Sequence, residues 1–175
     1  MSKELPSEKM AIKLLRQAGC SKRLIQHCRA VANFAVEIAE ACKKKGIEID
    51  VRLVRIGALL HDVGRVKTHR ADHGIVGAQI ARELNLPDEV VSIIERHVGI
   101  GITEDEAKRL GWPVKNYVPR SIEERIVAYA DKLIESSTRI PVEAAIEQFR
   151  RDKNIPEDSI ERFKQWHEKF MLCLK

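Results

Sequence analysis

Helical spacing of apolar residues extends through nearly the whole chain, and this feature limits the possible folds more than any other. Apolar side chains recur three and four positions apart in almost every segment, whereas no run alternates apolar and polar residues as a half-buried strand does. The chain has 175 residues, 44% of them hydrophobic, which is enough for one domain with a substantial core. We therefore expect an all-α fold, a compact bundle of many helices.

Capping residues divide this pattern into about eight or nine helices. Serine or aspartate N-caps, glycine stops and first-turn prolines mark their ends. The expected helices cover residues 7–18, 21–45, 50–61, 72–84, 87–97, 104–110 and 121–135, followed by two that begin at Pro141 and Pro156. No repeat or linker interrupts them. We expect a single domain over residues 1–175, with its core at about 21–139, a short N-terminal helix before it and two C-terminal helices after it.

Several polar side chains fall on the apolar faces of these helices. A lone inward histidine is more often a hydrogen-bonded core residue than a metal ligand, and a buried aspartate is often a cap or an arginine partner. Here, however, a single metal centre would satisfy the whole set, which otherwise needs several unrelated networks. Imidazoles and carboxylates suit Mn, Fe, Zn, Co or Ni. The residues of this set are His27, His61, Asp62, His73, His97 and Asp131.

The order of these residues resembles that of the HD superfamily of metal-dependent phosphohydrolases. His27 comes first, His61-Asp62-Val63-Gly64 is similar to the HD-I-G form of the motif, and Tyr129-Ala130-Asp131-Lys132 surrounds the last aspartate. The resemblance covers about residues 24–139. It implies an HD-domain bundle that hydrolyses a phosphoester or phosphoanhydride bond of a nucleotide-type substrate through a metal-activated water. Gly64 is expected to end its helix and leave room for that substrate.

One branch of the superfamily, the symmetrical diadenosine tetraphosphate hydrolases, resembles the chain further. The shared residues are His73-Gly74, Gly77-Ala78 and His97, although Val98 stands where that branch usually has a hydroxyl residue. This resemblance implies one or two divalent ions, the second held by His73 and His97, with Asp62 shared between the two.

The resemblance also implies roles for an acid and for several cations. Asp62 is expected to act as a general base or to orient the water. Arg65, Lys132 and Arg139 are expected to bind the substrate phosphate. Trp112 and Tyr117 lie in the irregular stretch 99–120, where they either pack or form a wall that receives a base.

Net charge and cysteine content bear on partners and compartment. The charge of +5 favours anionic partners, and a small phosphorylated nucleotide is expected. Nucleic acid is not expected, because no basic stripe is interleaved with aromatic residues. The sequence has no signal peptide or membrane-spanning stretch, so we expect a cytoplasmic protein with reduced thiols, Cys28 and Cys42 being buried.

Two alternatives to an enzyme remain at this point. One is a non-catalytic, metal-containing HD module that binds a nucleotide or RNA. The other is a purely structural bundle in which every inward histidine and aspartate is paired without metal.

Overall fold

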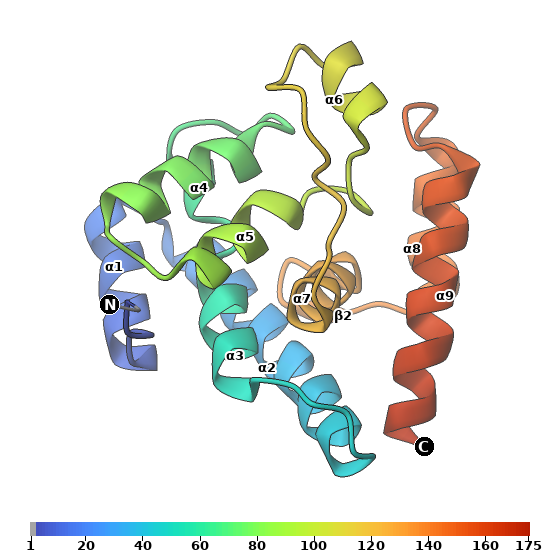
Figure 1. The fold of residues 1–175 in the computed structure, drawn as a ribbon, viewed down its shortest axis with the longest axis horizontal. Coiled ribbons are helices and arrows are strands. Elements are labelled where there is room, and N and C mark those ends of the chain that lie inside the picture. Colours follow the sequence, from blue (N-terminus) through green and yellow to red (C-terminus); the bar gives the residue numbers. More distant parts are fainter. Residues whose placement is uncertain (1–2) are drawn as a thin grey trace.

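The computed structural model describes residues 3–175, and its regular secondary structure is almost entirely helical (Figure 1). The expected all-α fold is confirmed. None of the described helices is long and apolar enough to cross a bilayer. The elements are α1 (Glu8–Ala18), α2 (Lys22–Lys44), α3 (Val51–Leu60), the 3₁₀ helix η1 (Val63–Val66), α4 (His73–Glu83), α5 (Asp88–Arg96), α6 (Glu104–Arg109), α7 (Ile122–Lys132), β1 (Ile134–Glu135), β2 (Thr138–Arg139), α8 (Val142–Arg151) and α9 (Glu157–Leu174).

The predicted caps explain where the first helices begin. Ser7, Ser21 and Asp50 each accept the backbone N–H of the residue three positions on. Gly19 ends α1 in the left-handed conformation, with φ 95°. Prolines 87, 141 and 156 occupy the N-cap, one residue before their helices rather than in the first turn.

One predicted helix end is wrong. The helix expected to reach residue 135 stops at Lys132, because Ile134–Glu135 pairs antiparallel with Thr138–Arg139. Two strands of two residues each are too short to show an alternating pattern, so the sequence did not indicate this hairpin.

Helix α2 is the element around which the others pack. It contacts α3, α7 and α9, and its buried face is made of valine, isoleucine, alanine and phenylalanine. Helices α4 and α5 lie side by side beyond α3, and α8 and α9 form the opposite flank of the molecule (Figure 1). The ends of α3, α5 and α7 therefore meet near the N-terminal half of α2.

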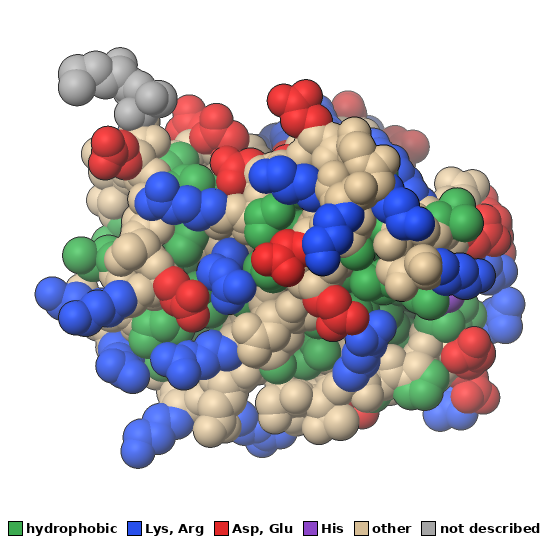
Figure 2. Space-filling model, turned by 90° about the horizontal axis from the view of Figure 1, so that it is seen from below, with side chains coloured by type: hydrophobic (Ala, Val, Ile, Leu, Met, Phe, Trp, Pro, Cys, Tyr) green, Lys and Arg blue, Asp and Glu red, His purple; other side chains and the backbone are tan. Residues whose placement is uncertain are grey.

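The surface is charged and mixed. Figure 2 shows lysine and arginine side chains spread over one face, with acidic side chains and apolar areas between them and almost no histidine visible. Of the six histidines in the chain, His61, His73 and His97 are buried. Their burial is unusual for a residue with a titratable ring and directs attention to the interior.

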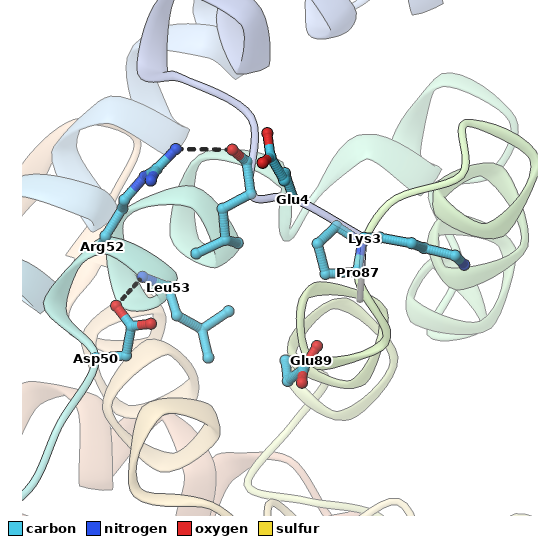
Figure 3. A pocket seen from close by; sticks show the side chains of 8 residues that line it. Lys3, Glu4, Asp50, Arg52, Leu53, Pro87 and Glu89 are labelled. Carbon is cyan, nitrogen blue, oxygen red and sulfur yellow. Dashed lines mark hydrogen bonds between the residues drawn. The ribbon is translucent and has the colours of Figure 1, made fainter. Parts of the chain in front are cut away.

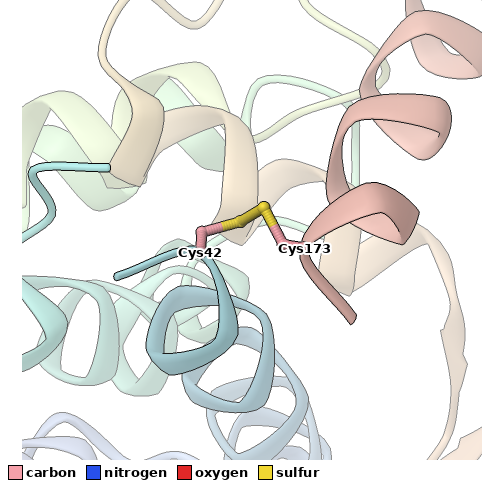
Figure 4. Close-up of a disulfide and its surroundings, with 2 residues drawn as sticks. All are labelled: Cys42 and Cys173. Atoms are coloured by element: carbon pink, nitrogen blue, oxygen red, sulfur yellow. A yellow bond between two sulfur atoms is a disulfide. The ribbon is translucent and has the colours of Figure 1, made fainter. Parts of the chain in front are cut away.

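A disulfide joins Cys42 near the end of α2 to Cys173 in α9, 131 residues away (Figure 4). The expectation of reduced thiols is therefore wrong for this pair, although Cys28 is buried and free as expected. The expectation rested on the usual redox compartments and not on any contact between these cysteines. Spacing along the sequence gives no signal for a pair so far apart.

We expect the disulfide to contribute about 3–5 kcal/mol to the free energy of unfolding, because it closes a very long loop in the unfolded chain. Urea unfolding of the oxidised protein and of the Cys42→Ser/Cys173→Ser variant would measure this difference. Cys20→Ser, at a half-buried free thiol, is the control. A reductant that left the unfolding midpoint of the wild-type protein unchanged would contradict the prediction.

Candidate metal centre

Five helical elements bring all six predicted side chains to one point in the interior. The Nε2 atoms of His27 and His61 lie 3.1 and 3.3 Å from Oδ1 of Asp131. The Nε2 atoms of His73 and His97 lie 3.0 Å from each other. The six come from α2 (His27), the end of α3 (His61 and Asp62), the first residue of α4 (His73), the residue after α5 (His97) and the last turn of α7 (Asp131).

Asp62 lies at the middle of this cluster. Its Oδ1 is 3.2 Å from Nε2 of His73 and 3.3 Å from Nε2 of His97. Its Oδ2 is 3.8 Å from Nε2 of His27 and 3.6 Å from Nε2 of His61. Each carboxylate oxygen therefore faces a different pair of histidines, which is the arrangement needed by a ligand shared between two ions.

All four imidazoles are oriented in the same way. Each Nδ1 lies 2.6–2.7 Å from a backbone carbonyl oxygen. A carbonyl only accepts, so Nδ1 carries a proton, and Nε2 is the atom that each ring directs at the cluster. The acceptors are Ala58 for His61, Arg70 for His73, Ile94 for His97 and Ser136 for His27.

The cluster is not satisfied by the protein alone. Among the described residues, Nε2 of His61 and Oδ1 of Asp62 are buried without a hydrogen-bond partner. The lone pairs of His73 and His97 also face each other at 3.0 Å, which is repulsive for two neutral rings. A cation removes both problems, and metal-ligating histidines commonly donate their other N–H to a carbonyl. The donor set therefore fits a divalent transition-metal ion.

Burial and neighbouring charges shift the pKa values of the cluster. Burial lowers the pKa of His97 to about 4, which keeps this ring neutral. Burial alone would raise the pKa of Asp62, but the nearby imidazoles of His61, His73 and His97 hold it well below its usual range. Burial likewise opposes ionisation of Asp131, whose pKa Lys132 and His61 keep low.

The pKa of His61 moves in the other direction. Burial would lower it, but the carboxylates of Asp62 and Asp131 raise it well above 6.5. In the metal-free protein, a second proton on His61 thus occupies Nε2, the atom that a metal ion would bind. Proton and metal compete for the same lone pair.

Gly64 allows the second half of the cluster to form. A Cβ atom on this residue would lie 1.9 Å from the carbonyl oxygen of His73 and 2.6 Å from the amide nitrogen of Gly77. The sequence prediction that Gly64 ends a helix and leaves room for substrate is wrong. Helix α3 ends at Leu60, Gly64 lies within η1, and the missing side chain makes room for α4 and so for His73.

Two of the three predicted phosphate-binding cations reach the cluster. Arg65 donates from Nε to Oδ2 of Asp62 at 2.9 Å. Lys132 donates to Oδ2 of Asp131 at 2.5 Å and to the carbonyl of His97 at 3.4 Å. Arg139 has other contacts: its guanidinium lies 3.7 Å from the ring centre of Phe34 and 3.6 Å from Glu37.

A cavity of about 730 Å³ opens beside the cluster. His27, Asp62 and Arg65 line it, together with His69, Arg23 and Ser136. Sequence reasoning missed Arg23 and Ser136, because Ser136 comes near His27 only through a hairpin 109 residues further along the chain. Trp112 and Tyr117 do not line this cavity. They stack edge to face with ring centres 5.5 Å apart, so the expectation that they pack is confirmed.

A second hollow, of about 520 Å³, lies elsewhere on the molecule, where residues 3–5 pass the starts of α3 and α5 (Figure 3). It contains none of the six clustered residues. Two of its polar side chains already have partners: Asp50 accepts from the Leu53 amide, and Arg52 donates to the Leu5 carbonyl. The cavity beside the cluster is therefore the candidate site.

Comparison with known proteins identifies the family. The HD domain model matches residues 24–135. The chain belongs to the HD domain family. This membership confirms that the chain is an HD domain, as the sequence resemblance implied, and HD domains bind divalent metals.

The relatives of this HD domain differ in what they are named for. It is 50% identical over 139 residues to an uncharacterized protein of Methanocaldococcus jannaschii, covering 78% of this chain and 82% of that one. It is 41% identical over 166 residues to the tRNA (cytidine(56)-2′-O)-methyltransferase of Picrophilus torridus, covering 95% of this chain and 47% of the methyltransferase. The chain thus spans about half the length of that enzyme.

A solved structure resembles the fold. The HD domain of the L. monocytogenes phosphodiesterase PgpH, in complex with cyclic-di-AMP, superposes with a TM-score of 0.57 over 90% of this chain and 92% of that one. The identity is 19%, so the likeness concerns the fold. The resemblance to diadenosine tetraphosphate hydrolases has no specific support from these comparisons.

Gly64→Ala is expected to destabilise the protein by more than about 3 kcal/mol and to weaken metal binding, because the new methyl group would displace the backbone of α4. Urea unfolding and metal titration would measure both effects. Gly46→Ala is the matched control: nothing lies within 4 Å of the new atom, and only its left-handed backbone, φ 86°, is strained. The control should cost about 1 kcal/mol. Equal losses in the two variants would contradict the role assigned to Gly64.

Metal uptake is expected to release protons. The raised pKa of His61 means that its proton stabilises the metal-free protein at low pH, and that this contribution is lost as pH rises through the folded-state pKa. Metal affinity should therefore increase with pH until that value is passed. Isothermal titration with Mn²⁺ in buffers of different ionisation enthalpy would count the protons. His61→Gln should abolish the release, and His69→Gln should keep it. Proton-free binding by the wild-type protein would refute this account.

Proposed function

We propose that this HD domain is a metal-dependent phosphohydrolase that cleaves a phosphoester or phosphoanhydride bond of a nucleotide-type substrate. One observation carries the proposal: four imidazoles, each fixed through Nδ1, direct their Nε2 atoms at the two oxygens of one buried carboxylate. The residues that would hold one or two divalent ions are His27, His61, Asp62, His73, His97 and Asp131. When bound, such ions lower the pKa of water and polarise phosphoryl oxygens.

Asp62 has two tasks in this proposal. Its carboxylate is shared between the two halves of the ligand set, as its distances to all four histidines support. Its low pKa makes it a weak base, so we assign it to orienting the attacking water rather than to storing the proton.

The contacts of the three cations predicted to bind phosphate suit them to different roles. Arg65 lines the cavity and bonds to Asp62 through Nε, which leaves the other guanidinium N–H groups for a phosphate. Lys132 is engaged by Asp131 and by the carbonyl of His97, so its contacts support a role in holding ligands rather than phosphate. Arg139 would have to leave Phe34 and Glu37 to reach a substrate. We therefore propose Arg65 as the principal phosphate ligand.

The comparisons favour phosphodiesters as the first substrates to test. PgpH binds cyclic-di-AMP, in which phosphodiesters join two nucleotides, and the Picrophilus torridus relative is named for tRNA, which has the same linkage. RNA therefore enters as a candidate substrate although the sequence had argued against nucleic acid. Diadenosine tetraphosphate remains the phosphoanhydride to compare.

A second candidate function is that of a non-catalytic, metal-containing module that binds a nucleotide or RNA. It is favoured by one observation: the chain corresponds to about half of a tRNA methyltransferase, so a unit of this kind accompanies an RNA-modifying enzyme. Turnover separates the two candidates, because only an enzyme releases a product.

Asp62→Ala is expected to lower kcat/KM for Mn²⁺-dependent hydrolysis of bis(p-nitrophenyl) phosphate by more than about 100-fold, since losing a shared ligand should exceed the 10–100-fold effect of outer partners. Metal content should fall with it. Asp105→Ala, an exposed aspartate on α6, is the matched control and should keep both. An active, metal-replete Asp62→Ala protein would refute the proposal.

Elemental analysis of protein purified without added metal or chelator refines this test. Close to two equivalents per chain would support all six ligands, and close to one would support His27, His61, Asp62 and Asp131 alone. A protein without metal that takes up no Mn, Fe, Co or Ni would overturn the metal-dependent function.

A further inference from the structure

The four imidazoles find their carbonyl acceptors in two different ways. His61, His73 and His97 each use the carbonyl of the residue three positions earlier. His61 and His97 directly follow α3 and α5, where the last carbonyls of a helix have no partner within it. His73 opens α4 and uses the turn before it. These three rings are oriented by their own local backbone.

His27 cannot be oriented in this way. It lies well inside α2, where the carbonyls of the preceding turn accept the hydrogen bonds of the helix itself. Its Nδ1 instead lies 2.7 Å from the carbonyl oxygen of Ser136, in the turn of the β1–β2 hairpin. The orientation of this ring therefore depends on a segment 109 residues away.

The hairpin is attached to α2 at several points. Ser136 has a left-handed backbone, φ 58°, and lies in the turn that reverses the chain between β1 and β2. Its Oγ accepts a hydrogen bond from Arg23, one helical turn before His27, at 3.3 Å. On the other strand, Arg139 lies over Phe34 and beside Glu37, both on α2. The contacts of Arg139, rather than the exposed bond from Arg23, hold the Ser136 carbonyl opposite the His27 ring.

We infer that the β1–β2 hairpin is a positioning element for His27, with Ser136 acting through its backbone carbonyl and Arg139 as its anchor. The inference rests on the metal centre of the proposed function. If the hairpin is displaced, Nε2 of His27 is no longer directed at Asp131, while the three locally oriented histidines keep their acceptors. Displacement should therefore weaken one metal position and spare the one at His73 and His97.

A pair of substitutions at one position tests this inference. Ser136→Val places a β-branched side chain where φ is positive, a conformation it adopts poorly, whereas Ser136→Gly adopts it readily and lacks only the hydroxyl. Titration with Co²⁺ is expected to show two sites in the wild-type and glycine proteins. In Ser136→Val, one of the two sites should bind at least about tenfold more weakly. Circular dichroism would establish that both variants fold.

A second pair tests the anchor. Arg139→Ala should weaken the same single site, whereas Arg150→Ala, an exposed arginine on α8, should leave both sites unchanged. Retention of two wild-type sites in both Ser136→Val and Arg139→Ala would overturn the inference. Equal weakening of both sites would also overturn it, because the effect would then be general.

A readout without metal separates this inference from the proposed function. The ¹⁵N resonances of the His27 ring at alkaline pH report which nitrogen carries the proton. The Nδ1–H form should dominate in the wild-type and glycine proteins and lose its dominance in Ser136→Val. An unchanged tautomer in Ser136→Val would overturn the inference whether or not the protein binds metal. A wild-type protein that binds no Co²⁺ would refute the metal centre, while a tautomer shift would still support the hairpin's role.

Discussion

A carboxylate removed from water and surrounded by four imidazole nitrogens is the interaction on which the rest of this molecule depends. Burying the Asp62 charge without a counter-charge is strongly unfavourable, and in the protein alone one of its oxygens has no hydrogen-bond partner among the described residues. The surrounding elements are arranged to compensate for this burial. His61 and Asp62 directly follow α3, and the absence of a side chain at Gly64 lets α4 pack close. His97 directly follows α5, and Asp131 lies in the last turn of α7.

The sequence predicted the helices and all six clustered side chains for the same physical reason. An amphipathic helix displays its buried face in its spacing, and a polar residue on that face must be compensated somewhere. Contacts between segments far apart in the chain leave no such trace. The sequence therefore missed the two-residue strands, the Cys42–Cys173 pair and the acceptor of His27. It also assigned Arg139 to phosphate from a resemblance, where local spacing carries no information about its contact with Phe34.

The four histidine rings of this one site are oriented partly by local backbone and partly by a distant segment. Three are oriented by backbone within a few residues, so their geometry forms as soon as their helices end. One is oriented by a hairpin that must first pack against α2. Because Ser136 also lines the cavity, a change in the hairpin would alter both the orientation of His27 and the shape of the cavity, while the three locally oriented rings would keep their acceptors.

The disulfide and the cluster both involve α2, near opposite ends of the helix. A bound ion shared by His27 and Asp131 would act as a second cross-link, joining positions 104 residues apart without a covalent bond. The chain would then be closed into two overlapping loops, residues 27–131 and 42–173, the first dependent on metal supply and the second on thiols. Resistance to proteolysis would then depend on both the disulfide and the bound ion. The ion proposed for the active site would therefore also contribute to the lifetime of the folded chain.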